Sequence, residues 1–260
     1  MIHDLFHKLL GLPVLASKHG RDVDAFLIYI HWLMIALFIG WTVFFIYTLI
    51  RFRQSRNPKA DYVGVKSKHV SNSLEGVVAL IEAVLLLGFA IPLWAKVVEG
   101  FPDQKESTVL KVIAQQFNWN FLYPGKDGEF GRQEVKLLSP ENQLGRDKSD
   151  PKGKDDFETL NEMHVPVGKP VIAYIMSKDV IHSFKVIAMR VCQDAIPGVP
   201  IPTWFTPTKE GRYQINCAQL CGIGHAGMAS GYITVESQEK YEQWLAEKAK
   251  TAGTGTTSFE

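Results

Sequence analysis

Two long apolar stretches lie near the start of the chain. Residues 25–50 contain no Asp, Glu, Lys or Arg, and residues 76–95 contain only Glu82. At about 1.5 Å per helical residue, the first stretch is long enough to cross a hydrocarbon core of about 30 Å. A buried helix of a soluble protein is the alternative, but the length disfavours it. We expect a transmembrane helical hairpin over 25–95, with helices at about 25–50 and 74–95.

The segment between the two helices, residues 51–73, is basic. Short loops rich in Lys and Arg stay in the cytoplasm, so we expect both ends of the chain on the opposite side of the membrane. The basic residues are Arg51, Arg53, Arg56, Lys59, Lys66 and Lys68, against one acidic residue, Asp61.

Residues 1–24 precede the first helix. Their apolar run, residues 9–16, is short, and no A-x-A cleavage site follows it. We expect an uncleaved extracytoplasmic segment that lies near the membrane surface.

Two acidic residues, Glu75 and Glu82, lie seven positions apart and therefore share one helical face. A carboxylate within a membrane span is costly and usually faces protein or water. An interfacial charge is the ordinary interpretation of Glu75, and a hydrogen bond to another helix is that of Glu82. Together they predict a neighbouring membrane subunit, because two helices alone cannot bury an acidic face.

The pattern changes from about residue 105 to short apolar runs broken by Gly, Pro, Asn and Asp, which is typical of an all-β domain. Residues 125–160 are polar and predict a long loop or insertion. Residues 237–260 predict a short helix and a flexible tail. Four aromatic residues alternate along one segment and should share one face of a strand: Phe117, Trp119, Phe121 and Tyr123.

Composition narrows the function only slightly. The net charge of +1 says nothing about acidic partners, and the sequence has no convincing repeat, phosphate loop, Ser-His-Asp constellation or nucleic-acid motif. The three cysteines include no CxxCH, so no c-type haem is attached to this chain.

The richest chemistry lies in residues 217–228, which read CAQLCGIGHAGM. Thiolate and thioether are soft ligands and imidazole suits copper, so the set favours copper. Two thiolates four residues apart can each bridge two ions, which indicates a binuclear centre. Zinc is an alternative, but Met is not a usual zinc ligand. A disulfide between Cys217 and Cys221 is another, but it leaves His225 and Met228 unexplained.

Two further residues bear on this cluster. His182 lies in residues 178–186, which predict a strand and its end, and it is the best candidate for a second imidazole. A structural role is the ordinary interpretation of a lone His there. Cys192 lies outside the cluster, and we interpret it as a buried structural residue because free Cys is usually buried. A small β-sandwich that carries these ligands in one late loop is typical of a cupredoxin.

At this point nearly the whole chain resembles subunit II of the haem–copper cytochrome c oxidases. The resemblance rests on four motifs in addition to the hairpin. They are Asp179-Val-Ile-His182-Ser183, Asp194-Ala-Ile-Pro-Gly198, Cys217-x3-Cys221-x3-His225-x2-Met228 and the segment 161–168. A quinol oxidase subunit of the same architecture lacks the copper ligands, all of which are present here.

The resemblance implies a membrane-anchored all-β protein, with a cupredoxin copper A domain over 96–236. Two copper ions would be held by His182, Cys217, the backbone carbonyl of Gln219, Cys221, His225 and Met228. A separate c-type cytochrome would supply single electrons, which pass to haem a of subunit I. Oxygen reduction and proton translocation would occur there, so no catalytic residue is expected in this chain. The resemblance also implies subunit III, surrounding lipid and a bacterial inner membrane.

Further roles follow from the same resemblance. Glu75 would lie at the mouth of a proton channel, and Asp194 and Gln219 would lie at the subunit I interface. The family commonly has Glu where this chain has Gln219, and that Glu reaches magnesium. Magnesium is therefore not assigned here, although the amide oxygen could bind it weakly. Phe117 stands where the family has the Trp of electron entry, and Trp119 matches the second Trp.

Two departures from the family pattern bear on the partners. Phe117 replaces the Trp of the entry position, and the insertion 125–160 is long enough to contact an extra partner. A standalone membrane-anchored copper electron carrier, or a copper-delivery protein, remains the alternative function.

Overall fold

The computed structural model describes residues 8–59, 62 and 68–252. Lys66, Asp61 and the predicted tail from residue 253 lie outside these residues. The chain forms two compact units. One contains residues 22–99, and the other contains residues 13–21 together with residue 100 onward. We call them the helical unit and the β unit.

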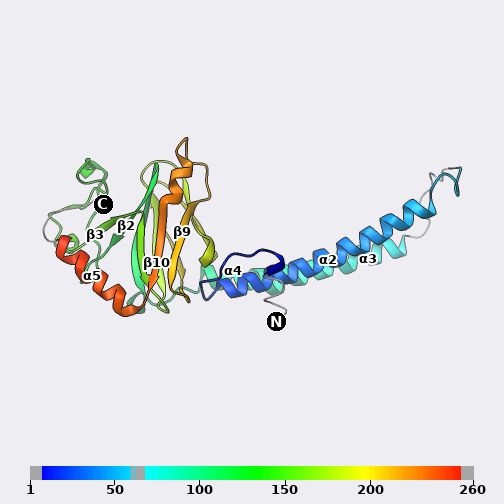
Figure 1. Cartoon of the computed structure of the whole chain (residues 1–260), viewed down its shortest axis with the longest axis horizontal. Helices are drawn as coiled ribbons and strands as arrows, with labels where there is room; N and C mark the ends of the chain where they lie inside the picture. The colour runs from blue at the N-terminus through cyan, green and yellow to red at the C-terminus, as the bar shows by residue number, and fades with distance from the viewer. Residues whose placement is uncertain (1–7, 60–61, 63–67, 253–260) are drawn as a thin grey trace. The chain divides into compact units, whose positions relative to one another are not determined.

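The helical unit consists of two long antiparallel helices (Figure 1). Near one end Lys96 Nζ lies 2.6 Å from Asp22 Oδ2, and further along the rings of Tyr29 and Phe89 meet edge to face at 5.7 Å. Both helices are long and apolar enough to cross a membrane, and none of their most apolar window is buried within the unit. The elements are α2 (Gly20–Arg51), α3 (His69–Leu85), the π-helical segment η1 (Leu86–Ala90) and α4 (Ile91–Val98).

Both helices extend beyond the apolar stretches that predict them. The first begins at Gly20 and the second runs from His69 to Val98. Polar residues at the end of a helix can still make the i to i−4 backbone hydrogen bonds, so each helix continues beyond its apolar stretch. The second helix also passes Pro92, which lacks an N–H and would clash with the preceding turn of a regular α-helix. The wider π turn directly before it, Leu86–Ala90, accommodates that defect.

The β unit is a sandwich of two five-stranded sheets (Figure 1). Each sheet contains one parallel pair, β1 with β5 and β10 with β4, and the other neighbours are antiparallel. In spatial order the first sheet is β3 (Phe157–Leu160), β2 (Asn118–Tyr123), β1 (Thr108–Gln115), β5 (Val171–Ser177) and β8 (Ile201–Phe205). The second is β4 (Glu162–Pro166), β10 (Gly231–Glu236), β9 (Gly211–Cys217), β6 (His182–Val186) and β7 (Val191–Ala195). The predicted fold class, two apolar helices followed by a cupredoxin-like sandwich, is confirmed.

The alternating aromatic residues of β2 fill the space between the sheets. Trp119, Phe121 and Tyr123 are at most 1% exposed, and Phe117 packs against the same cluster from its edge. Burying large aromatic rings supplies much of the hydrophobic stabilisation of a sandwich. At the far end of the core, helix α5 (Gln238–Ala252) is held by Trp244, whose ring stacks on His164 at 4.2 Å.

Residues 13–21 belong to the β unit rather than forming a separate surface segment. Ala16 is fully buried, donates its N–H to Ala188 O at 2.8 Å and accepts from the N–H of Thr208 at 2.8 Å. Ser17 donates its hydroxyl to Met189 O at 2.6 Å. The segment therefore extends the sandwich just before helix α2 begins.

The polar segment after β2 is ordered. We call residues 125–156 the insertion, because Phe157–Leu160 is strand β3. Leu144 is 5% exposed and packs with Ile113 and Leu122 on the outer face of the first sheet. Asn142 closes a loop by donating to Leu137 O and Arg146 O at 3.0 and 2.9 Å. The insertion is thus a thin third layer.

Candidate metal centre

Two loops meet at one end of the second sheet. Strand β6 begins at His182 and strand β9 ends at Cys217, and the two strands pair with Phe184 opposite Cys217. The N–H of Ala218 donates to Ser183 O at 3.0 Å, which extends the pairing into the turn. We call residues 217–228 the ligand loop. The register brings this loop against His182, which lies 35 residues earlier in the sequence.

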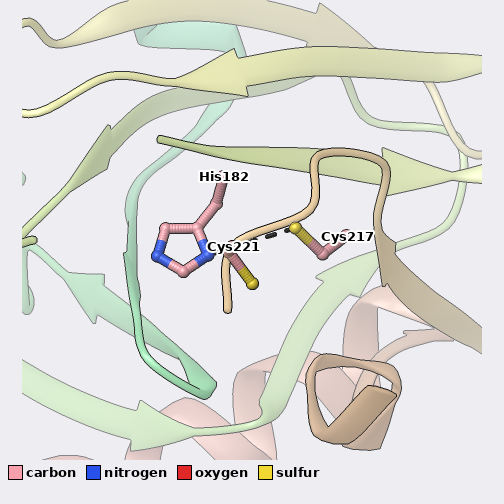
Figure 2. A group of neighbouring side chains, drawn as sticks. All are labelled: His182, Cys217 and Cys221. Carbon is pink, nitrogen blue, oxygen red and sulfur yellow. Dashed lines mark hydrogen bonds between the residues drawn. The ribbon is translucent and has the colours of Figure 1, made fainter. Parts of the chain in front are cut away.

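Three soft or borderline donors converge at this point (Figure 2). The ligand atoms of His182, Cys217 and Cys221 all lie within 4.8 Å of one another. His182 Nδ1 is 4.0 Å from Cys217 Sγ, and His225 Nδ1 is 3.4 Å from Cys221 Sγ. The carbonyl of Gln219 accepts from the Cys217 thiol at 3.0 Å, while the Gln219 side chain is exposed.

Met228 lies in the short 3-10 helix η6 (His225–Ser230) and is fully buried. Trp119 fixes its backbone, because the indole N–H donates to Met228 O at 2.9 Å. The same indole meets the His182 ring edge-on at a centroid distance of 6.3 Å. Trp119 thus touches residues of both ligand-bearing loops.

Asp179 orients the imidazole of His182. Its Oδ1 lies 2.9 Å from His182 Nε2, so Nε2 carries the proton beside this carboxylate and Nδ1 is left free to face the two sulfur atoms. Partial burial by itself would raise the pKa of Asp179. Hydrogen bonds from the Gln116 N–H and the His182 ring outweigh burial, and the pKa lies below its usual value. The carboxylate is therefore ionised at neutral pH.

The turn between β1 and β2 clasps the ligand loop from the outside. Gln116 donates its side-chain N–H to Cys221 O at 2.7 Å and its backbone N–H to Asp179 Oδ2 at 2.7 Å. Phe117 lies against the glycines of the loop, and a Cβ added at Gly224 would come within 2.4 Å of the Phe117 ring. The absence of side chains at Gly222 and Gly224 lets this ring approach the loop.

The donor set fits a soft metal ion. Burial, and then the neighbouring Cys217, raise the pKa of Cys221 to about 11, so this thiol keeps its proton until a cation displaces it. Two sulfurs, two imidazole nitrogens, a thioether and a carbonyl are the donors that copper accepts, and the thioether is foreign to structural zinc sites. Cys217 and Cys221 are free thiols in the structure, which leaves both available as ligands.

Other residues singled out in the sequence lie apart from this cluster. Asp194 is exposed on β7 opposite Ser183. Glu75 and Glu82 are exposed on α3 in the helical unit, where Glu75 accepts from the Ser71 hydroxyl at 2.8 Å. The expectation that Cys192 is buried is wrong: its side chain is exposed on β7, because its neighbour Val191 takes the inward position of the alternating strand.

The orienting roles of Asp179 and Gln116 are not evident from the sequence. Asp179 lies three residues before His182, in the motif Asp179-Val-Ile-His182-Ser183, but nothing in the spacing tells which way its carboxylate points. A short acidic residue beside a ligand His is nevertheless a usable signal, because ligating imidazoles commonly donate their second N–H to a carboxylate.

Comparisons with known proteins cover both loops. The family model described as cytochrome C oxidase subunit II, periplasmic domain, matches residues 108–237. The alternative cytochrome c oxidase subunit 2 of Bradyrhizobium diazoefficiens is 33% identical over 223 residues, which cover 85% of this chain and 78% of that protein. The cytochrome c oxidase subunit 2 of Cereibacter sphaeroides is 31% identical over 239 residues, covering 83% and 75%. The solved periplasmic domain of subunit II from Bradyrhizobium japonicum matches with 30% identity and a TM-score of 0.42, covering 58% of this chain and 97% of that one.

Proposed function

We propose that this chain, which belongs to the cytochrome c oxidase subunit II family, holds a dinuclear copper A centre and relays electrons from a c-type cytochrome to haem a of subunit I. The observation that carries the proposal is the convergence of the His182, Cys217 and Cys221 donor atoms within 4.8 Å. The six ligands would be His182, Cys217, the carbonyl of Gln219, Cys221, His225 and Met228.

When bound, two copper ions that share one unpaired electron supply storage for a single electron. The protein supplies geometry and a shell with little water. Cys221 and Met228 are at most 4% exposed, and His182 is fully buried. Asp179 holds His182 in the tautomer that presents Nδ1 to the sulfurs, and Gln116 and Trp119 fix the backbone of the ligand loop. A pre-organised ligand shell of this kind limits rearrangement on each electron transfer.

Electron entry would use the surface beside the ligand loop. Phe117 is half-buried there, and Trp119 is fully buried behind it beside His182. We propose that these two rings lie on the route from the donor cytochrome. The amide of Gln219 carries no charge, so no magnesium is proposed at this position.

Residues 13–21 support the membrane arrangement of the proposal. They hydrogen-bond into the β unit, so the chain before helix α2 and the chain after α4 lie on the same side of any membrane that the helices cross. Two transmembrane helices return the chain to the side on which it started, whereas a single transmembrane helix would leave its two ends on opposite sides. With a basic connecting loop in the cytoplasm, the β unit would lie on the periplasmic side of a bacterial inner membrane.

Partner subunits follow from the helices. Their apolar side chains are exposed along both helices, and Glu75 and Glu82 interrupt this surface. Lipid can cover the apolar part but not the carboxylates. This favours a place beside subunit I, with Glu75 at the entrance of a proton channel and Asp194 and Gln219 at the interface, and beside subunit III. Oxygen reduction and proton translocation would then occur in the partners, and a standalone copper carrier is disfavoured.

The test uses the full chain in neutral detergent, loaded with copper. We expect two copper ions per chain and an electron paramagnetic resonance spectrum in which both share one unpaired electron. Cys217→Ser should abolish this spectrum, because one of the two thiolates that would hold the copper ions is lost, while Cys192→Ser should leave it unchanged. A single blue copper, or zinc in place of copper, would contradict the proposal. Co-purification with a haem-containing subunit tests the partner, and recovery as a stable haem-free monomer would support the standalone carrier.

A further inference from the structure

We propose that the donor cytochrome docks on an uncharged, apolar surface at the ligand loop, with Ile223 as its main contact. The surface consists of Phe117 and residues 222–224, and we call it the entry surface. This inference rests on the proposed function and adds the chemistry of the partner: a c-type cytochrome whose haem edge is surrounded by apolar and neutral side chains. In each encounter the ferrous haem would lose one electron to the copper centre and become ferric.

Ile223 projects from the ligand loop without packing on the protein. It is 107% exposed, the highest value among the described large apolar residues. The glycines on either side of it lie against the Phe117 ring, and a Cβ added at Gly222 would come within 3.1 Å of that ring. A side chain this exposed buries no apolar area on folding, so its whole area remains available for burial against a partner.

The position of Ile223 selects the donor as that partner. The segment that carries Ile223 lies against Phe117, the outer of the two rings proposed for electron entry. A protein that covers Ile223 therefore brings its redox group close to this ring. Leu220, which is 78% exposed, instead adjoins Gln219, which we place at the subunit I interface. The two exposed large apolar residues of the loop are thus assigned to different partners.

The entry surface has no charged residue in its surroundings along the chain. Ile223 lies within residues 213–235 and Phe117 lies within residues 112–125, and neither range contains Asp, Glu, Lys or Arg. The first range is the longest uncharged run from residue 100 onward. A single exposed apolar side chain is ordinary on a protein surface. In a long uncharged run beside a proposed electron route, it is typical instead of the core of a docking interface, where charged residues are depleted.

The charged residues that contact the turn next to Phe117 compensate each other. Lys178 Nζ donates to Gln115 Oε1 at 2.6 Å, and Asp179 Oδ2 accepts from the N–H of Gln116 at 2.7 Å. Asp194 lies on β7, which β6 separates from β9 and the ligand loop. Electrostatic steering of a partner needs an excess of one sign of charge. The entry surface offers no such excess, so the matching face of the partner is neutral and the encounter depends little on salt.

The rate of electron entry tests this chemistry. Stopped-flow mixing measures reduction of the copper-loaded full chain, in neutral detergent, by two ferrous c-type cytochromes: one with an uncharged haem edge and one whose haem edge is ringed by lysines. With the first, the second-order rate constant should change less than about twofold between about 0.01 and about 1 M salt. Ile223→Ser should lower it about tenfold, because the apolar contact is lost. Val135→Ser removes an apolar side chain from a residue of the insertion that is 84% exposed, and it should leave the rate unchanged.

Ile223→Glu tests the same position in the opposite direction. A carboxylate there should accelerate reduction by the lysine-ringed cytochrome at low salt and make that rate fall as the salt concentration increases. Equal effects of Ile223→Ser and Val135→Ser, or a wild-type rate that is highest with the lysine-ringed cytochrome and falls steeply with salt, would overturn the inference. The paramagnetic spectrum of each variant reports separately on the copper centre. An intact spectrum confines such a failure to the docking surface, whereas a wild-type chain without this spectrum would overturn the proposed function as well.

Discussion

Two irregular segments of the β unit, the ligand loop and the insertion, are held in place in opposite ways. The ligand loop is fixed by its neighbours: Gln116, in the turn between β1 and β2, and Trp119, on β2, both donate hydrogen bonds to its backbone. The insertion is fixed largely by itself, through Asn142, Arg146 and Asp150, whose side chains bond its own backbone. A loop held from outside keeps its own side chains free to act as ligands. A loop that holds itself uses its side chains for that purpose.

This contrast predicts that metal affinity and local stability can be changed separately. The largest effect should come from Asp179→Asn, which keeps the size of the side chain but removes the charge that orients His182. Loss of such a partner typically weakens metal binding about 10–100-fold. Competition with a copper chelator measures the affinity. Asp194→Asn, on the neighbouring strand, is the control, and equal affinity in the two variants would show that Asp179 does not orient the ligand.

The next effect tests the contact between the ligand loop and Phe117. A Cβ at Gly224 would lie 2.4 Å from the Phe117 ring, whereas one at Gly227 would meet Phe117 only at 3.8 Å. Gly224→Ala should therefore displace the ring or the loop and cost about 1–3 kcal/mol. Gly227→Ala should be nearly neutral. Thermal unfolding and the paramagnetic spectrum of the copper-loaded chain report the two effects, and similar behaviour of both variants would refute the contact.

In the insertion, the corresponding test is Arg146→Ala. Arg146 Nη2 donates to Asp156 O and Gly153 O at 2.5 and 3.2 Å, so its loss leaves two carbonyls without their donor. We expect a local destabilisation of about 1–2 kcal/mol, seen as faster amide hydrogen exchange over residues 131–156, with unchanged copper affinity. Arg132→Ala removes ion pairs of a side chain that is 65% exposed, and it should cost less than about 1 kcal/mol. A change in the copper affinity of the Arg146→Ala variant would show that the insertion and the ligand loop are not independent of each other.

The smallest effect is a dependence of the insertion on pH. Hydrogen bonds from Ser149 lower the pKa of Asp147, and those from the N–H groups of Arg132 and Lys152 lower the pKa of Asp150. A lowered pKa in the folded state stabilises the fold above the usual Asp pKa of about 3.9, and this contribution is lost as the pH falls through the lowered value. Burial raises the pKa of Asp156, which acts in the opposite direction.

Hydrogen exchange of the insertion between pH 6 and 3 should therefore accelerate, beyond its intrinsic pH dependence, only below about pH 4. Asp150→Asn removes part of this response. An acceleration that begins near neutral pH would contradict the assignment.

The same contrast explains what the sequence could predict. The ligand loop was predictable because its chemistry lies in residue types at fixed spacing, from Cys217 to Met228, and the strand pattern indicated where His182 would lie. The hydrogen bonds of Gln116 to Cys221 O and Asp179 could not be predicted, because they depend on which way one side-chain amide points. The order within the insertion was hidden for a similar reason: Asn142 and Arg146 are ordinary loop residues until their backbone partners are known. Cys192 was misjudged because its residue type was given more weight than the alternation of its strand.

The short segment that joins the β unit ahead of helix α2 also orders the events of synthesis. Ser17 bonds a residue 172 positions later, so this part of the sandwich cannot close until both helices and most strands have been made. Contacts of such long sequence separation form late because their loop-closure entropy is paid first. Ala188 and Met189, which receive this segment, directly follow strand β6, whose first residue is His182. We therefore expect a newly made chain to complete its hairpin before the sandwich is ready to receive metal, so that loading comes last.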